Sequence, residues 1–402
     1  MANSSSNQKG EELIFKFVKN WSEPDLLLQG IVFLDEILIS SWRSRAYTMS
    51  TFNPDQLDYV NPNSERRVCL ITGGNSGIGF YTVLHLYLHG YTVYLAGRNK
   101  LRVTTAISAI EKEALERRSK YSTAQLNARH LGSLHHLSLD LLSLDSVEAA
   151  TKEFKQLEKA LHLLILNAGI MAVPYEKTKD VFEIQLQTSY VSHFLLTDRL
   201  IDLMTSEESD QQVRNGVLGD PASVKNRTGS IIRDPRIIFL SSIGHWFAFF
   251  PFKLDWQYNY WPNMIFTLFR YGMAKCAGIQ FMKSLAIRHP SVLSVSVHPG
   301  IVLNTNLFTL LTTLPLIGTI YWILFKLFEL VIGISNEEGS YSSVYCALSS
   351  NVNRDKDNGK FYTTFGVESN PSYIANNPSL IEKSWAWTVH QLDSRGHKID
   401  SL

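Results

Sequence analysis

Two residues of this chain have the types and spacing needed to move a proton. Tyr271 and Lys275 are four positions apart, which places both side chains on one face of a helix. A phenol is a poor base near neutral pH, but a neighbouring ammonium favours the phenolate and is expected to lower its pKa. Tyr271 is therefore the predicted acid/base that exchanges a proton with an alcohol or carbonyl oxygen.

A glycine-rich loop lies upstream of this pair, at residues 72–79 (TGGNSGIG). Gly73 permits a tight turn, Gly77 lets the backbone approach a pyrophosphate, and Gly79 lets a helix pack closely on a strand. The following helix would offer unpaired N–H groups to phosphate. The loop predicts a dinucleotide site with contacts from Gly73, Asn75, Ser76, Gly77, Ile78 and Gly79.

The end of the second predicted strand indicates which dinucleotide is used. The run Ala96-Gly97-Arg98-Asn99 has no carboxylate that could bind the ribose hydroxyls of NAD. The planar guanidinium of Arg98 can instead pair with a 2′-phosphate. NADP(H) is therefore the expected cofactor.

Other strand ends are expected to complete the site. Asp140-Leu141 can accept a hydrogen bond from the adenine amine. The small residues of Asn167-Ala168-Gly169 can allow the backbone to pass beside the cofactor ribose. The backbone of His298-Pro299-Gly300 can border the nicotinamide amide, to which Thr305 can also bond. Ser241 and Ser242 end a further strand, where one hydroxyl can orient a substrate carbonyl.

An alternation of strands and helices positions these motifs. Strands are predicted at 68–72, 91–97, 134–140, 161–167, 236–242 and 292–298, and helices at 77–90, 100–118, 144–160, 181–204 and from Tyr271 to about His289. Such repeats form a parallel sheet with right-handed crossovers and helices on both faces. The expected fold is one doubly wound, Rossmann-type α/β domain over 61–395 with strand order 3-2-1-4-5-6-7. The polar stretches 117–133 and 205–234 are expected to be surface insertions.

Two apolar segments stand outside this alternation. Residues 26–39, within an N-terminal extension at 1–60, have helical apolar spacing but are too short to span a bilayer comfortably. Residues 307–325 carry no charge, and the apolar character extends to 334, although Pro315 and Gly318 disfavour one straight span. Each segment can lie in a membrane interface. Alternatively, the first packs on its own domain and the second covers a substrate pocket.

The composition of the 402-residue chain excludes several classes of protein. A hydrophobic content of 45% with 19% charged residues supports a sizeable core, and a net charge of +1 gives no reason to expect nucleic acid. The three cysteines show no metal-ligand spacing, so no metal site is expected. The N-terminus lacks the cationic start and apolar run of a secretory signal peptide.

The motifs TGGNSGIG, AGRN, LDL, LNAGI, YGMAK and HPG, in this order, resemble those of the short-chain dehydrogenases/reductases over residues 64–390. FEIQLQTSYVSHFLLT and the long gap between serine and tyrosine resemble the retinol-dehydrogenase-like members. YTVLHLYLHG, NAGIMAVP, HPGIVLNTNLF and WTVHQL are similar to fungal lipid-droplet oxidoreductases linked to vacuole morphology. The resemblance implies a membrane-facing, NADPH-using enzyme acting on a lipophilic alcohol or carbonyl.

The resemblance also assigns roles to residues. Ser242, rather than Ser241, matches the catalytic serine, and Tyr271 matches the acid/base. Lys275 matches the residue that binds ribose and lowers the tyrosine pKa. At Ser189 the family usually has an asparagine that holds a water in the proton relay, so this chain departs from the pattern there. His193 and His245, which flank these residues, are expected to be structural.

The expected activity is interconversion of a lipophilic alcohol (retinoid-, steroid- or long-chain-like) and its aldehyde or ketone. The aromatic runs 245–252 and 256–266 favour an apolar pocket, although they can equally serve as core or membrane anchors. The expected location is the cytosolic face of a lipid droplet, the endoplasmic reticulum or the vacuolar membrane. A second copy of the chain, forming a homodimer, is an additional candidate partner. The alternative is an NADPH-binding interaction protein of such a surface with little turnover.

Overall fold

The computed structural model describes residues 52–205, 234–248, 253–255, 258–260, 263–302 and 333–402. The apolar segment 26–39, Thr305, nearly all of 307–334 and nearly all of the polar stretch 205–234 lie outside these residues. Within the described part of the chain, no helix is long and apolar enough to cross a membrane.

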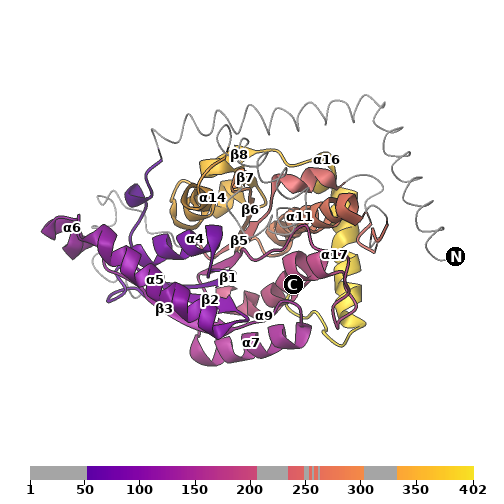
Figure 1. Cartoon of the computed structure of the whole chain (residues 1–402), viewed down its shortest axis with the longest axis horizontal. Coiled ribbons are helices and arrows are strands. Elements are labelled where there is room, and N and C mark those ends of the chain that lie inside the picture. The colour runs from indigo at the N-terminus through magenta and orange to yellow at the C-terminus, as the bar shows by residue number, and fades with distance from the viewer. Residues whose placement is uncertain (1–51, 206–233, 249–252, 256–257, 261–262, 303–332) are drawn as a thin grey trace, which may run out of the picture.

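An eight-stranded sheet forms the centre of the molecule (Figure 1). Its order is β3-β2-β1-β4-β5-β6-β7-β8, and neighbouring strands from β3 to β7 run parallel. The strands are β1 (Val68–Thr72), β2 (Thr92–Gly97), β3 (Ser133–Ser138), β4 (Leu163–Leu166), β5 (Arg236–Leu240), β6 (Leu293–Val297), β7 (Phe361–Thr363) and β8 (Val367–Ser369). The predicted fold class and strand order are confirmed, with β8 added antiparallel to β7 at the edge.

The central strands are apolar throughout because both faces of the sheet are covered. In β1, Leu70 faces one hydrophobic core while Ile71 faces the other. In β4, Leu164 and Ile165 divide in the same way. Successive side chains of a strand point to opposite faces, so a strand covered on both sides reads as a continuous hydrophobic run.

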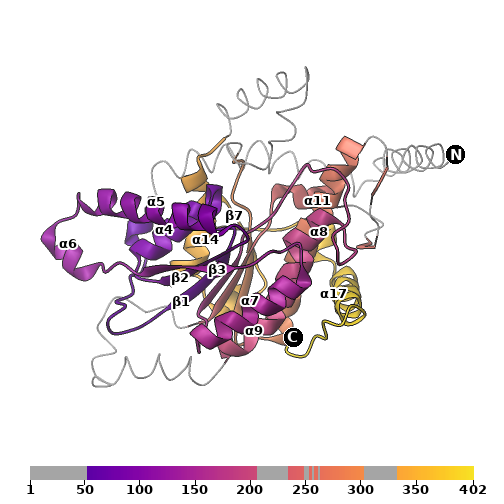
Figure 2. The same ribbon diagram turned by 60° about the horizontal axis from the view of Figure 1, so that its bottom comes forward.

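Helices form a layer on each face of the sheet (Figure 2). One layer contains α4 (Gly77–Leu88), α5 (Lys100–Arg118) and α14 (Asn336–Leu348). The other contains α7 (Leu144–Leu157), α9 (Ser192–Thr205), α11 (Asn263–Arg288) and α17 (Pro378–Asp393). The shorter α-helices are α6 (Thr123–Ala128), α8 (Ile184–Leu186), α15 (Arg354–Asp357) and α16 (Tyr373–Asn376).

Two elements differ from the sequence prediction. The single helix expected over 181–204 is divided into α8, a π-helical turn at Gln187–Val191 and α9. The insertion expected over 117–133 contains α6, whose first turn is closed by reciprocal hydrogen bonds between Ser122 and Gln125. This capping box satisfies N–H groups that a helix of only six residues would otherwise leave exposed.

Hydrogen bonds attach Val60 and the last two residues of the chain to the domain. The backbone N–H of Val60 donates to the carbonyl oxygen of His89 at 2.9 Å. At the other end, the N–H groups of Ser401 and Leu402 donate to the Asp198 carboxylate on α9.

Candidate active site

The site lies at the carboxyl edge of the sheet, where β1, β4, β5 and β6 end. Ligands of open α/β sheets bind outside the carboxyl ends of the strands, at the point where the strand order reverses. Here that point lies between β1 and β4. The sheet order therefore brings the glycine loop, the end of β4 and the end of β5 to one place.

The glycine loop has the backbone geometry that a phosphate cradle requires. Gly73 and Gly77 have φ values of +68° and +57°, a region that favours glycine. A Cβ at Gly79 would come within 2.3 Å of the Gly73 carbonyl oxygen. The N-cap of α4, Ser76, makes no side-chain capping hydrogen bond, so its hydroxyl does not block the first turn of the helix. The loop fits a dinucleotide pyrophosphate at this helix N-terminus.

Hydrogen bonds fasten the end of β4 to the glycine loop. The backbone N–H groups of Asn167 and Ala168 both donate to Thr72 Oγ1 at 3.0 Å. The Asn167 side-chain amide donates to the carbonyl oxygens of Thr72 and Gly73. Sequence reasoning expected the Asn167-Ala168-Gly169 backbone beside the ribose. The structure shows in addition that the Asn167 side chain holds the loop, and that Thr72, which the prediction overlooked, joins β1 to β4.

Arg98 stands at the end of β2 with its side chain 67% exposed. Its guanidinium lies 4.0 Å from the carboxylate of Asp140, which follows β3. Asp140 is itself oriented by accepting the N–H of Leu142. Arg98 and Asp140, which are both predicted to contact the adenosine part of the cofactor, are thus neighbours.

The other half of the site is built around Tyr271 on α11 and Ser242 after β5. Gly244 lets the two meet, because a Cβ there would come within 2.7 Å of the Tyr271 ring. Ser242 Oγ accepts the Gly244 N–H at 3.1 Å and hydrogen-bonds to Tyr271. The neighbouring Ser241 hydroxyl instead donates to the Lys275 carbonyl oxygen at 3.2 Å. This geometry favours Ser242 over Ser241 as the functional serine.

Lys275 is buried one turn further along α11. Its Nζ donates to the Leu240 carbonyl oxygen at 2.7 Å and lies 5.7 Å from the centroid of the Tyr271 ring. Burial lowers the pKa of Lys275 to about 7. Burial raises the pKa of Tyr271 to about 12, and the hydrogen bond from Ser242 opposes this rise.

This direction is opposite to the lowered tyrosine pKa expected from sequence. The reason is that both side chains are removed from water, which disfavours the charged form of each. The hydrogen bond from Ser242 favours the Tyr271 phenolate and partly offsets the effect of burial.

Ser189 lies in the π-helical turn and faces the same point as Lys275. A Cβ on Gly169 would be 3.0 Å from Lys275 Nζ and 3.3 Å from Ser189 Oγ. Ser189 is fully buried, and its hydroxyl has no hydrogen-bond partner among the described residues. π-helical turns recur at functional sites. The structure therefore brings Ser189, Lys275, Tyr271 and Ser242 to one region.

Two further predicted parts of the site are the residues after β6 and His245. Pro299 and Gly300 follow β6, and Gly300 has φ +94° and lies against Ile334 and Thr364. His245 is buried and bonds to the Ser242 carbonyl oxygen and the Ser372 N–H. Both bonds join backbone groups, which is consistent with the structural role expected from sequence.

A buried ion pair beside Tyr271 was not found by sequence reasoning. Arg270 Nε lies 3.2 Å from the Glu183 carboxylate, and both side chains are almost fully buried. Arg270 also donates to the carbonyl oxygens of Tyr258 and Val173. It therefore connects α11 with the start of α8 and with the loops that follow β4 and β5.

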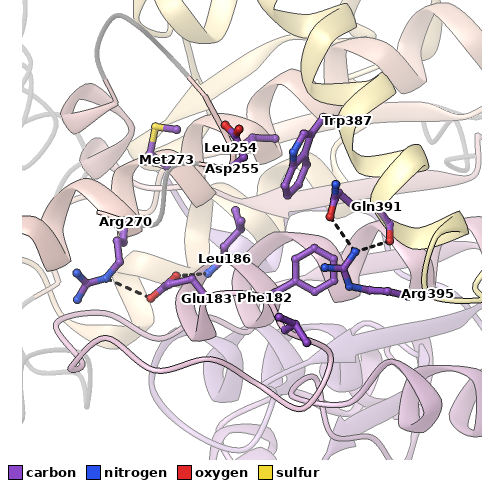
Figure 3. A pocket seen from close by; sticks show the side chains of 11 residues that line it. Phe182, Glu183, Leu186, Leu254, Asp255, Arg270, Met273, Trp387, Gln391 and Arg395 are labelled. Carbon is purple, nitrogen blue, oxygen red and sulfur yellow. Dashed lines mark hydrogen bonds and ion pairs between the residues drawn. The ribbon is translucent and has the colours of Figure 1, made fainter. Parts of the chain in front are cut away.

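A pocket of about 180 Å³ opens next to this ion pair (Figure 3). Glu183 and Arg270 lie on one side of it, and Trp387 and Gln391 of α17 lie on the other with Arg395, which follows α17. None of Ser242, Tyr271 and Lys275 lines it. It is therefore separate from the site around Tyr271.

Comparison with known proteins identifies the family of this chain. Residues 67–213 match the short chain dehydrogenase family. The chain is 32% identical to the short-chain dehydrogenase/reductase drtF of Aspergillus calidoustus, over 84% of this chain and 98% of that protein. It is 30% identical to mouse retinol dehydrogenase 12 (74% and 77% covered) and 28% identical to human polyprenol dehydrogenase (82% and 86% covered).

Solved structures agree on the fold. A protein of Mycobacterium paratuberculosis superposes with a TM-score of 0.56 at 20% identity, over 87% of this chain and all of that chain. A short-chain type dehydrogenase/reductase of Mycobacterium marinum gives 0.50 at 18% identity, over 75% and 95%. The chain belongs to the short-chain dehydrogenases/reductases and is an oxidoreductase of their retinol-dehydrogenase-like group.

Proposed function

We propose that this protein is an NADP(H)-dependent oxidoreductase that interconverts a lipophilic alcohol and its aldehyde or ketone at a membrane or lipid-droplet surface. The observation that carries the proposal is the meeting of the Ser242 and Tyr271 hydroxyls beside Lys275, across from the glycine loop. A bound nicotinamide would supply or accept the hydride.

The proton is handled by this chain's own residues. Ser242 Oγ accepts the Gly244 N–H, so its own proton is free to be donated toward Tyr271 or a substrate oxygen. With a pKa of about 12, Tyr271 holds its proton at neutral pH and is ready to donate it to a carbonyl oxygen. Lys275, with a pKa of about 7, can hold or release a proton near neutrality.

The choice of NADP(H) is supported by Arg98. Its guanidinium is exposed at the end of β2, and the carboxylate of Asp140 is 4.0 Å away. An incoming 2′-phosphate would compete for this guanidinium as a bidentate partner.

Contact with a lipid surface is supported by the position of the described residues nearest to the apolar segments in sequence. The described residues that flank 303–332, Val302 and Ile334, pack in one cluster with Ile78 of the glycine loop. The ring of Phe52, the first described residue of the N-terminal extension, lies 5.0 Å from the ring of Tyr341, which packs against the same cluster. The described residues on both sides of 303–332, and Phe52, thus lie close to the cofactor loop.

A lipophilic substrate concentrates in lipid, so an entrance near that surface spares it a passage through water. The names of two relatives, a retinol dehydrogenase and a polyprenol dehydrogenase, are consistent with an apolar alcohol as substrate. Retinoid, steroid and long-chain substrates are all compatible with these residues. The proposed location of the protein is the cytosolic face of a lipid droplet, the endoplasmic reticulum or the vacuolar membrane.

The second candidate function is an NADPH-binding protein of that surface with little turnover. Ser189 favours it, because its shorter side chain replaces the asparagine expected in the proton relay. Purified full-length protein, assayed with NADPH and a panel of apolar aldehydes and ketones, separates the two. NADPH oxidation that depends on the carbonyl compound supports the enzyme, whereas NADPH binding without oxidation across the panel supports the second candidate.

A further inference from the structure

His193 on α9 touches both halves of the site without lining either. The imidazole is fully buried, with Nε2 2.9 Å from Thr72 Oγ1 and Nδ1 3.4 Å from the carbonyl oxygen of Ser189. Thr72 ends β1 at the glycine loop, and Ser189 lies in the π-helical turn. One side chain therefore connects the cofactor loop with the turn beside Lys275.

The hydrogen-bond partners define which nitrogen carries the proton. A carbonyl oxygen can only accept, so Nδ1 is the donor to Ser189. Burial and the nearby Lys275 lower the pKa of His193 to about 3, so the ring is neutral and Nε2 is an acceptor. Thr72 Oγ1 already accepts two N–H groups, from Asn167 and Ala168, which leaves its own proton for Nε2.

The hydrogen bonds of this chain can all be made in one direction of donation. The N–H groups at the end of β4 donate to Thr72, Thr72 donates to His193, and His193 donates to Ser189. Reversing one of these bonds would leave a buried polar atom without a partner. Such a chain of bonds fixes its members relative to one another.

We propose that His193 is a positioning residue that couples the cofactor loop to the Ser189 turn, so that binding NADP(H) also orders the turn beside Lys275. The inference rests on the proposed function for its role in turnover. The proposal is that the glycine loop and the Ser189 turn are energetically coupled. Such a coupling acts in both directions, so if an ordered turn favours cofactor binding, a ligand at the glycine loop must also protect the turn.

Two conservative variants separate the two bonds of the imidazole. His193→Gln can place a side-chain oxygen near the position of Nε2 and keep an acceptor for Thr72, but it gives up the donor to Ser189. His193→Asn can place an amide N–H near the position of Nδ1 and keep the donor to Ser189, but it does not reach Thr72. The matched control is His162→Gln, because His162 is also buried and neutral but accepts from Val68 at the opposite end of β1.

The experiment measures NADPH affinity by fluorescence titration and hydrogen exchange of peptides over 70–80 and 184–196, using the full chain in detergent. In the wild-type protein, NADPH should slow exchange in both peptides. His193→Asn should weaken NADPH binding by roughly fivefold, the scale of one lost hydrogen bond. His193→Gln keeps the bond to Thr72, so it should weaken NADPH binding less than His193→Asn does, but it should lose the protection of 184–196. His162→Gln should lower the melting temperature and leave both readouts unchanged.

The inference is overturned if NADPH leaves 184–196 unprotected in the wild-type protein, or if both His193 variants change the two readouts in the same way. Should neither variant fold, Thr72→Val tests the same coupling. Exchange must then rise in 184–196 as well as in 70–80, and a rise confined to 70–80 rejects the coupling. Neither readout requires a substrate. If no aldehyde or ketone of the panel causes NADPH oxidation, the proposed function is rejected, but the coupling is still tested by NADPH binding and hydrogen exchange.

Discussion

Lys275 Nζ donates to the Leu240 carbonyl oxygen at 2.7 Å, which ties the middle of α11 to the last residue of β5. A second bond runs from the hydroxyl of Ser241, which follows β5, to the Lys275 carbonyl oxygen. Because Ser242 is the next residue along the chain, these two bonds hold its backbone beside α11, the helix that carries Tyr271. The parts of the proposed proton-transfer site are thus held by the sheet.

The first prediction concerns cofactor choice. Arg98→Asp removes the proposed partner of the 2′-phosphate and replaces it with a repulsive charge. NADPH binding should weaken by about 2 kcal/mol or more, the scale of a lost charge-assisted hydrogen bond plus repulsion. NADH binding should suffer much less, and both are measured by titration. Arg102→Asp, one turn into α5, is the control for a general change of surface charge. Equal losses for NADPH and NADH in Arg98→Asp would remove Arg98 as the discriminating residue.

The second prediction concerns the departure at Ser189. Ser189→Asn restores the family's usual side chain, so turnover should hold or rise if a water chain feeds Tyr271. Ser189→Ala, the control, should leave stability almost unchanged, because the serine hydroxyl has no partner among the described residues. Steady-state kinetics and thermal melting check both variants. A large fall in turnover of a folded Ser189→Asn protein would show that this relay is built around serine.

The third prediction concerns the ion pair beside Tyr271. Arg270→Met leaves the Glu183 carboxylate buried without its charged partner, and such a change costs about 3–5 kcal/mol. Lys155→Met is the matched control, because it breaks an exposed pair with Asp202 that contributes less than about 1 kcal/mol. Urea unfolding measures both. Equal effects of the two variants would mean that the buried pair has no special role in holding the loops around α11.

The fourth prediction concerns location. The full-length protein should fractionate with membranes or lipid droplets, and serine at Leu316, Ile317, Ile320 and Ile323 should release much of it. Apolar burial contributes roughly 25 cal/mol per Å², so a contact of a few hundred Å² would give several kcal/mol of binding before entropic losses. Serine at four exposed apolar residues of the domain, Leu101, Leu115, Leu157 and Ile287, is the control and should release none. Wild-type protein found wholly in the soluble fraction at physiological salt would contradict the prediction.

Much of the framework could be predicted from the sequence because its signals are local. The run Val68–Thr72 and the helix Lys100–Arg118 have the predicted bounds, since each is marked by an apolar run or a change of periodicity. Strand β8 was not predicted, because three residues at the sheet edge carry no pattern. The π-helical turn was missed because five residues within a helix do not reveal a change of period.

The site was predictable in its residues but not in its electrostatics. The spacing of Tyr271 and Lys275 shows that they share a helix face, but it does not show how deeply they are buried. Their depth decides the direction of both pKa shifts. The ion pair of Arg270 with Glu183 joins residues far apart in sequence, and no local pattern announces it.

The most direct test of the proposed chemistry is the turnover of Tyr271→Phe, measured with NADPH and a carbonyl compound that the wild-type protein reduces. The variant loses only the proton-transfer hydroxyl, so we expect turnover to be abolished while the Kd for NADPH stays nearly unchanged. Lys275→Ala, measured alongside, should impair both, because Lys275 is also expected to contact the ribose. Turnover of Tyr271→Phe at the wild-type rate would contradict the account and remove Tyr271 from the mechanism.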